Sequence, residues 1–521
     1  MQHPQSGTIS DSTDPSPLGL SPKVAGVVLA LLLVSAFAIR LPYLSRSPYE
    51  FHTGRQFHAA LLARNYELGG GVSSADADQR MAALDRAPLV EPPLVELAVA
   101  GVWRITGSEP LWVGGLVSVL AWMLGGWWMY ALGRRLVSRL AGLVAAALFV
   151  WTPVGIAASR AFMPDPLMVA AIVGATLRLV IDDEQLDRRS FALAAGSGAF
   201  ALFVKSVAGF FVVPVLVGLT VSREGWRGLV SRRAIGLAAL IVAPALAWQV
   251  YGTWIQHFLA VQSDGRILPD LLIGSTFWSN WWSLATEVTG YAPLLVAAVG
   301  LVLARGRVRW VIGALFAGYV VFGLLFDYHY STHIYYHLPL LVPVGLGVGA
   351  AVDAGVRRAQ ATRSARDLTV VALTAMLLLL SIVHWQVSLV DYGPGADVIA
   401  QQEQIAVAVG DATGHSDRVI MLAGADGDLL RFYGRVAGPV WPEEFDLAAE
   451  HLQGHQPQTV EDRFDQTSEM LGGARFFAVT AKDQLAAQPD LQPFLDGRYR
   501  RIADCGGTCV VWDLTSAKTG G

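Results

Sequence analysis

The residues best suited to chemistry are charged and aromatic side chains at the ends of apolar runs. Glu50, His52 and Arg55 follow the first apolar run, in the stretch "PYEFHTGRQFHAALLARNY" (48–66), and Lys205 separates two later runs. Ionisable residues at membrane depth are costly and usually mark a function. The pattern therefore predicts a site at one face of a membrane.

A carboxylate beside cations suits proton transfer next to an anionic lipid head group. Glu50 could accept a proton from an acceptor hydroxyl. Arg55 and Lys205 could neutralise charge that develops on a phosphate leaving group. Because nucleotides are scarce outside the cytoplasm, a donor used there would be activated on a lipid, and no nucleotide cofactor is expected.

The elements that position these residues are apolar helices. The chain has 521 residues, of which 53% are hydrophobic and 15% charged, well below the roughly 25% charged residues of a soluble domain. The net charge of −4 gives no reason to expect nucleic acid. The sequence predicts a polytopic α-helical membrane protein with about eleven spans, at 24–41, 111–132, 140–158, 166–181, 191–204, 207–221, 234–250, 289–304, 310–326, 337–352 and 368–386.

Two further apolar segments need a separate interpretation. The segment 93–106 contains Glu96 and Arg104 and is too short to span, so it is predicted to be an interfacial helix. "GLGVGA" (345–350) imitates a dinucleotide-binding fingerprint, but no strand precedes it. Its glycines instead favour close packing of helices.

Basic residues predict the orientation. One set of loops carries about 17 Lys and Arg residues, which places that set and the N-terminus in the cytoplasm. Residues 1–22 are predicted to be a disordered cytoplasmic tail, and 23–390 the membrane domain, with a first outer loop at about 42–110. An odd number of spans then places 391–521 outside the cytoplasm.

Residues 391–521 are predicted to form a small soluble α/β domain. "DRVIMLAG", "ARFFAVT" and "CVVWDL" are typical of buried strands. In "CGGTC" the glycines allow a tight turn, so Cys505 and Cys509 could form a disulfide outside the cytoplasm. Two unpaired thiols are the alternative.

Five short motifs occur in the order found in a known family. They are Glu50 followed by "GRQFHAALLARNY", Glu91-Pro92-Pro93-Leu94, Asp165 in "PDPLM", Lys205 in "KSVAG", and "YYHLPLLVP" at 335–343. In this order the chain resembles the membrane glycosyltransferases of the GT-C fold. The resemblance is to the group of the protein O-mannosyltransferases and the transferase that adds aminoarabinose to lipid A.

The resemblance implies an integral plasma-membrane enzyme of the cell envelope. It would transfer a hexosyl or pentosyl group, with inversion, from a polyprenyl-phosphate sugar to a glycan, lipid or protein acceptor on the outer face. Glu50 would be the catalytic base. Residues implied to bind the donor phosphate or the acceptor are Arg55, His52, Lys205, Asp165, Tyr335 and His337.

The chain departs from this family at two positions. The family usually has Asp, often Asp-Glu, where this chain has Glu50 after Tyr49. Glu91 matches a carboxylate that helps to hold a divalent metal ion in the aminoarabinose transferase, so the resemblance implies that Glu91 could hold a divalent metal ion here. The loop that supplies a His there reads "FLAVQSDGRIL" in this chain and contains none.

Each signal also has a simpler structural interpretation. Glu50 could be a solvated carboxylate paired with Arg55, Glu91 and Asp165 could lie at helix starts, and Lys205 could extend to the membrane interface. His329, His333 and His337 recur every four residues and would line one face of a helix, or belong to an interfacial aromatic belt.

Two other functions remain open at this stage. A transporter or flippase for lipid-linked sugars would show polar residues near the middle of the bilayer. A non-catalytic relative would keep the fold as an assembly partner.

Overall fold

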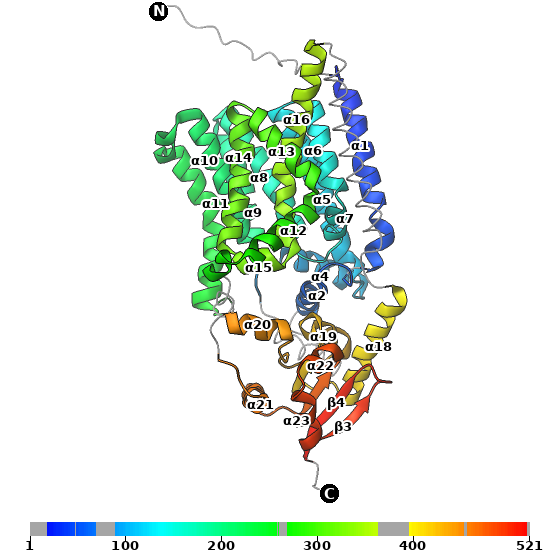
Figure 1. Cartoon of the computed structure of the whole chain (residues 1–521). Coiled ribbons are helices and arrows are strands. Elements are labelled where there is room, and N and C mark those ends of the chain that lie inside the picture. Colours follow the sequence, from blue (N-terminus) through cyan, green and yellow to red (C-terminus); the bar gives the residue numbers. More distant parts are fainter. Residues whose placement is uncertain are drawn as a thin grey trace, which may run out of the picture.

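The computed structural model describes residues 18–46, 48–68, 89–257, 259, 268–362, 395–452 and 456–517. A long bundle of helices lies above a smaller α/β part (Figure 1). The bundle helices are α1 (Pro22–Ala38), α5 (Trp112–Leu136), α6 (Arg139–Trp151), α7 (Pro153–Ala158), α8 (Asp165–Gln185), α9 (Arg188–Val204), α10 (Gly209–Glu224), α11 (Arg232–Val250), α12 (Ser275–Thr289), α13 (Tyr291–Leu303), α14 (Gly306–Leu325), α15 (Asp327–Thr332) and α16 (Leu341–Thr362).

Several of these helices identify an integral membrane protein. Six helical segments of the described residues are long and apolar enough to cross a bilayer, or up to seven if the bent pair α12–α13 is one span. Ten of the eleven predicted spans coincide with helices, while 368–386 lies outside the described residues. The predicted number of eleven spans is therefore not confirmed.

Two short helices lie between the bundle and the smaller part. Figure 1 shows α2 (Thr53–Leu68) and α4 (Leu94–Thr106) at the end of the bundle. The bounds of α4 agree with the predicted short helix at 93–106. One face of α4, with Val99 and Trp103, is buried, while Ile105 is exposed.

The glycines of "GLGVGA" (345–350) lie where helices pack closely together. A Cβ atom built on Gly300 of α13 would lie only 1.8 Å from the carbonyl oxygen of Gly347 in α16. Backbones this close exclude any side chain at that contact. The packing interpretation of "GLGVGA" is confirmed.

The C-terminal part holds a four-stranded sheet in the order β1-β2-β4-β3. Its strands are β1 (Val419–Leu422), β2 (Phe476–Val479), β3 (Tyr499–Asp504) and β4 (Val510–Ala517). β1 and β2 are parallel, with Val419 opposite Phe476, and the other pairs are antiparallel. The three predicted strands are β1, β2 and β4. β3 was missed because it is largely exposed and has no continuous apolar pattern.

Helices surround this sheet, and a disulfide joins its last turn. The helices are α18 (Ala396–Thr413), α19 (Asp428–Gly434), α20 (Glu444–Leu452), α21 (Val460–Glu469), α22 (Lys482–Ala487) and α23 (Leu491–Arg498). Cys505 and Cys509, between β3 and β4, are bonded with their Cα atoms 5.0 Å apart.

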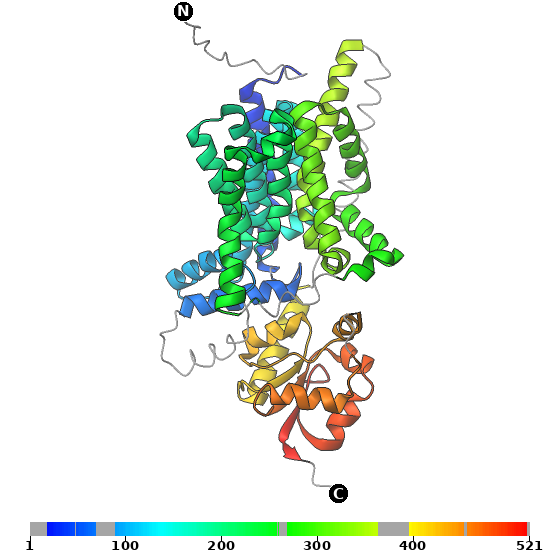
Figure 2. The same cartoon turned by 90° about the vertical axis from the view of Figure 1, so that its left-hand side faces the viewer.

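The C-terminal part packs against α2. Arg64 donates to the carbonyl oxygen of Phe432 at 2.8 Å and lies over the Phe432 ring at 3.8 Å. The Tyr49 hydroxyl donates to Glu403 at 2.5 Å and lies 3.0 Å from the Tyr433 hydroxyl. Figure 2, turned by 90°, shows the same part below the end of the bundle where α2 lies. Contacts thus link it to the turn that holds Glu50.

Candidate active site

The predicted site residues come from helix ends and interruptions. Lys205 ends α9 with an extended backbone (φ −158°, ψ 120°), before a short 3-10 turn (η2, Ser206–Ala208) leads into α10. Asp165 begins α8, and Glu91 lies just before the two prolines that precede α4. Breaks in helices expose polar backbone groups, which are tolerated at membrane depth only beside protein or water. These breaks bring the site residues to one end of the bundle.

Four of these side chains form an ion-pair network. Lys205 Nζ lies 2.9 Å from Asp165 Oδ1 and 3.3 Å from Glu91 Oε1. Arg55 Nη2 donates to both Glu91 oxygens, at 3.0 and 3.1 Å. The side chains of Lys205 and Asp165 are only 6% and 2% exposed. Two cations therefore share two carboxylates where water is largely excluded.

The network keeps its members charged. Burial would raise the pKa of the Glu91 carboxyl, but Arg55 and Lys205 outweigh it and lower the pKa to about 2. Burial would lower the pKa of the Lys205 ammonium, yet Asp165 and Glu91 raise it. Glu91 is thus a fixed anion rather than a base that exchanges protons near neutral pH.

A cavity of about 410 Å³ opens beside this network, called here the cationic cavity. Arg55, Glu91, Lys205 and Tyr335 line it, and the Lys205 ammonium lies 5.3 Å from the Tyr335 ring. The buried Nε of Arg55 has no hydrogen-bond partner among the described residues. Arg55 and Lys205 both present positive charge to this space. It suits a phosphate group.

Glu50 lies outside the lining of the cationic cavity and pairs with a different cation. Its Oε2 accepts from Arg160 Nη2 at 2.5 Å, and both side chains are buried. Arg160 also lies over the Tyr43 ring at 4.7 Å. Glu50 Oε1 is buried with no hydrogen-bond partner in the described part of the chain. One carboxylate oxygen is thus held while the other remains unused.

Gln56 positions Glu50 opposite Arg160. Its amide donates to the carbonyl oxygens of Pro48 and Phe51 at 3.1 and 2.5 Å, on either side of Glu50. Its carbonyl oxygen accepts from the Phe162 backbone at 2.7 Å. Sequence reasoning left Arg160 and Gln56 out of the site. The only signal was their presence in the same polar segments as Glu50 and Asp165.

The environment of Glu50 changes its proton affinity. Burial raises the pKa of the carboxyl above its ordinary value, and Arg160 opposes this only in part. A raised carboxyl pKa brings a general base closer to neutral pH, where proton transfer is most effective.

Two neighbouring imidazole rings, those of His52 and His333, lie beside the cationic cavity. The rings are stacked 5.8 Å apart, and His52 meets the edge of Tyr335 at 4.6 Å. Burial, with Arg55 nearby, lowers the pKa of His52 to about 4, and burial with His52 and Arg55 does the same to His333. Both rings are neutral at physiological pH.

The predicted helical row of histidines is wrong. α15 ends at Thr332, His333 is extended, and a 3-10 turn, η7 (Ile334–Leu340), follows. His329 and His333 line the cationic cavity, but His337 is fully buried elsewhere. His337 Nδ1 lies 2.7 Å from the Tyr319 hydroxyl, and Nε2 lies 2.8 Å from the Tyr330 carbonyl oxygen. With both nitrogens occupied, the predicted substrate contact of His337 is corrected to a structural role.

The described residues do not fit a divalent metal site around Glu91. No group of three or more His, Cys, Asp or Glu side chains among them could hold a metal ion. Both oxygens of Glu91 accept from Arg55, and Lys205 is close to one of them. A metal ion there would meet the positive charges of Arg55 and Lys205, which already occupy the carboxylates of Glu91 and Asp165.

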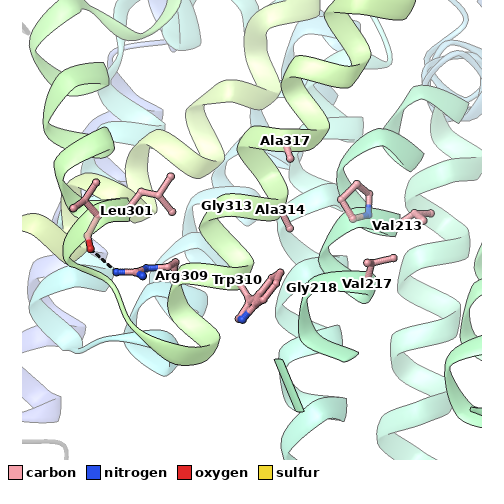
Figure 3. Close-up of a pocket in the computed structure, with 11 residues that line it drawn as sticks. Val213, Val217, Gly218, Leu301, Arg309, Trp310, Gly313, Ala314 and Ala317 are labelled. Carbon is pink, nitrogen blue, oxygen red and sulfur yellow. Dashed lines mark hydrogen bonds between the residues drawn. The ribbon is translucent and has the colours of Figure 1, made fainter. Parts of the chain in front are cut away.

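An apolar hollow lies apart from this chemistry. Figure 3 shows it among α10, α13 and α14, with Val213, Val217 and Trp310 on its walls, and its volume is about 760 Å³. Its one charged side chain, Arg309, donates to the carbonyl oxygens of Ala304 and Val302 at 2.7 and 2.6 Å. Among the described residues, the walls of this hollow carry no carboxylate and no histidine, so it offers none of the groups suited to proton transfer.

Comparison with known proteins agrees with the arrangement of helices. The sequence model of the dolichyl-phosphate-mannose-protein mannosyltransferase family matches residues 90–248, a range that includes Glu91, Asp165 and Lys205 but not Glu50. The solved structure of ArnT from Cupriavidus metallidurans bound to undecaprenyl phosphate matches with a TM-score of 0.60 and 15% identity, over 95% of this chain and 99% of that one. The chain has the GT-C fold.

Other solved GT-C structures share the fold at similar distance. The oligosaccharyltransferase AglB from Archaeoglobus fulgidus, in complex with an inhibitory peptide and a dolichol-phosphate, matches with a TM-score of 0.54 and 12% identity, over 92% of this chain and 74% of that one. The arabinofuranosyltransferase AftD from Mycobacteria matches with a TM-score of 0.52 and 16% identity, over 95% and 40%. A search of curated proteins finds no match.

Proposed function

We propose that this protein is a membrane glycosyltransferase that moves a sugar from a polyprenyl-phosphate donor to an acceptor. The observation that carries the proposal is the cationic cavity, where Arg55 and Lys205 are held by buried carboxylates at the end of an apolar bundle. A membrane-embedded donor with a phosphate group would place its anion there. The matched ArnT and AglB structures contain undecaprenyl phosphate and dolichol-phosphate.

In the proposed reaction, the donor phosphate binds Arg55 and Lys205, and Tyr335 flanks it. Glu50 takes the proton from the acceptor hydroxyl as that oxygen bonds to the anomeric carbon. The bond from this carbon to the phosphate oxygen breaks, and its electron pair leaves with the polyprenyl phosphate. Attack from the opposite face inverts the anomeric configuration. The two cations stabilise the charge that develops on the leaving phosphate.

His52, Asp165 and Glu91 have supporting roles in this proposal. Asp165 and Glu91 hold Lys205, so neither is available as a base. The neutral His52 ring contacts Tyr335, and can donate or accept a hydrogen bond to sugar hydroxyls. No step is assigned to a metal ion, because the residues around Glu91 do not fit one.

We also propose the topology that the charges predict. The N-terminus lies in the cytoplasm, eleven spans cross the plasma membrane, and 391–521 form a soluble domain outside. The Cys505–Cys509 disulfide supports this side, since disulfides persist in oxidising compartments. In intact cells, a membrane-impermeant maleimide should label a cysteine introduced at Asp465 but not one at Arg227. The reverse pattern would refute the orientation.

The test of function uses the full-length protein in lipid nanodiscs with radiolabelled polyprenyl-phosphate sugars and envelope extracts as acceptors. Wild type should release polyprenyl phosphate and form a labelled product, and Glu50→Gln should do neither. Glu184→Gln, at the other end of the bundle, is the matched control and should remain active. Movement of lipid-linked sugar across vesicles without any product would identify a transporter instead.

A further inference from the structure

Three cavities follow one another from the bundle into the C-terminal part. The second, called the junction cavity, measures about 390 Å³ and shares Arg55, His333 and Tyr335 with the cationic cavity. The third, called the C-terminal cavity, measures about 870 Å³ and shares Asp426 and Asp446 with the junction cavity. Because neighbouring cavities share lining residues, they lie side by side in a row, called here the path.

The walls of this path change from membrane residues to polar residues of the C-terminal part. The C-terminal cavity is bordered mainly by polar side chains, including the carboxylates of Asp426, Glu450 and Asp462 and the amides of Gln458 and Gln466. A lipid chain would gain little there, since apolar burial drives its binding. A ligand rich in hydroxyl groups could pair with many of these atoms.

The charge of the path selects against anions. The C-terminal part contributes the carboxylates Asp426, Glu443 and Asp446 to the junction cavity. The cation of the C-terminal cavity, Arg463, already donates to Glu450 at 3.0 and 2.7 Å. A phosphorylated or acidic polymer would meet repulsion along most of this length. Neutral or amine-bearing ligands would not.

An exposed aromatic ring stands where the path leaves the membrane part. Phe445 lines the junction cavity with 52% of its surface exposed. Its ring lies 5.8 Å from that of Tyr328. An exposed aromatic face of this kind provides an apolar platform, on which the C–H face of a sugar ring can stack.

We propose that the junction and C-terminal cavities bind the acceptor, and that the acceptor is a chain of neutral or amine-bearing sugars. The inference rests on the proposed glycosyl transfer. The terminal sugar of the acceptor would lie at Arg55, His333 and Tyr335, where the path meets the cationic cavity, and the preceding sugars would extend toward α21. That terminal sugar would carry the hydroxyl that attacks the donor.

The test measures binding to the full-length protein in nanodiscs, without donor. The probes are neutral gluco-, manno- and arabino-oligosaccharides and amine-bearing chitosan oligosaccharides, from monosaccharide to hexasaccharide, with a basic hexapeptide as the other class of polymer. In at least one series, affinity should rise with length, because each added sugar reaches further lining residues.

Variants at the two ends of the path sharpen this test. Gln466→Ala, in the C-terminal cavity, should weaken hexasaccharide binding about fivefold, as expected for the loss of a hydrogen bond, and leave disaccharide binding unchanged. Phe445→Ala should weaken both. Asp465→Asn lies on the same helix but outside the lining, and should change neither. Thermal unfolding of each variant checks that it folds.

The outcomes separate this inference from the proposed function. Affinity that does not depend on length in any series, or stronger binding of the peptide than of every oligosaccharide, overturns the acceptor path. If transfer occurs but Gln466→Ala leaves the KM for long acceptors unchanged, the path is wrong and the function stands. If binding depends on length but no sugar is transferred, the path stands and the function fails.

Discussion

The two ends of α8 carry carboxylates in opposite settings. Asp165 in the first turn pairs with Lys205, and both side chains are almost completely buried. Asp182, Asp183 and Glu184 in the last turn pair with Arg233, Arg223 and Arg307, and these arginines are 25–30% exposed. A 21-residue helix of about 30 Å separates the two clusters.

The helix dipole adds to the difference between the carboxylates at the two ends of α8. A carboxylate at the N-terminus of a helix is favoured by the helix dipole, and one at the C-terminus is not. The last-turn carboxylates are therefore stabilised mainly by their arginine partners. Partial exposure to solvent lowers the desolvation cost of these ion pairs. The first-turn pair is favoured by the dipole but carries a desolvation cost that hydrophobic residues would avoid. A cluster kept despite that cost favours a functional role. The last-turn pairs, whose arginines are partly exposed, carry less of this cost.

The largest effect is expected from breaking the buried cluster. Lys205→Met would leave Asp165 and Glu91 with one cation fewer, and breaking a buried pair costs about 3–5 kcal/mol. Thermal or denaturant unfolding should show this loss, and glycosyl transfer should be abolished. Lys205→Met/Asp165→Asn should recover stability but no activity. Recovery of both would show that the cluster is only structural.

Next in size is the effect of Glu50→Gln. Removal of a general base costs roughly 10²–10⁴-fold in rate, while the amide can still accept from Arg160. The transfer rate should fall by this factor, and stability should fall as well, because Arg160 loses its buried ionic partner. Glu50→Asp should retain part of the rate. A rate for Glu50→Gln equal to wild type would exclude Glu50 as the base.

The pH profile of transfer tests the role of Arg160. Burial raises the pKa of Glu50, so activity should be lost, as pH falls, at a higher pH than for an ordinary carboxyl. Arg160 opposes the shift, so Arg160→Gln should move this acidic limb to still higher pH. The rate at high pH should be affected less. An unmoved limb would show that Glu50 does not control the profile.

His337→Ala should affect stability and not chemistry. The variant loses contacts to Tyr319 and Tyr330, and leaving buried polar groups unpaired costs about 1–3 kcal/mol. Unfolding should occur at lower temperature, with KM and kcat of the folded fraction unchanged. A raised KM for the donor would restore the substrate role predicted from the sequence.

The smallest effect is expected for the ion pairs in the last turn of α8. Arg307→Gln removes a contact of 2.7 Å to Glu184, and surface ion pairs contribute about 0–1 kcal/mol. Transfer should remain at wild-type rate and unfolding should shift slightly, if at all. Strong inactivation would contradict the contrast between the two ends of α8.

The sequence by itself determined the apolar helices, three of the four strands and the order of Glu91, Asp165 and Lys205 along the chain. These features are local, because hydropathy and helix-breaking residues act over a few turns. Tertiary structure alone decided that Glu50 pairs with Arg160, 110 residues away, and that His337 turns into the core. It also placed cavities of the bundle and of the C-terminal part next to one another. Such contacts depend on where packed helices place their ends, and spacing along the chain does not encode that placement.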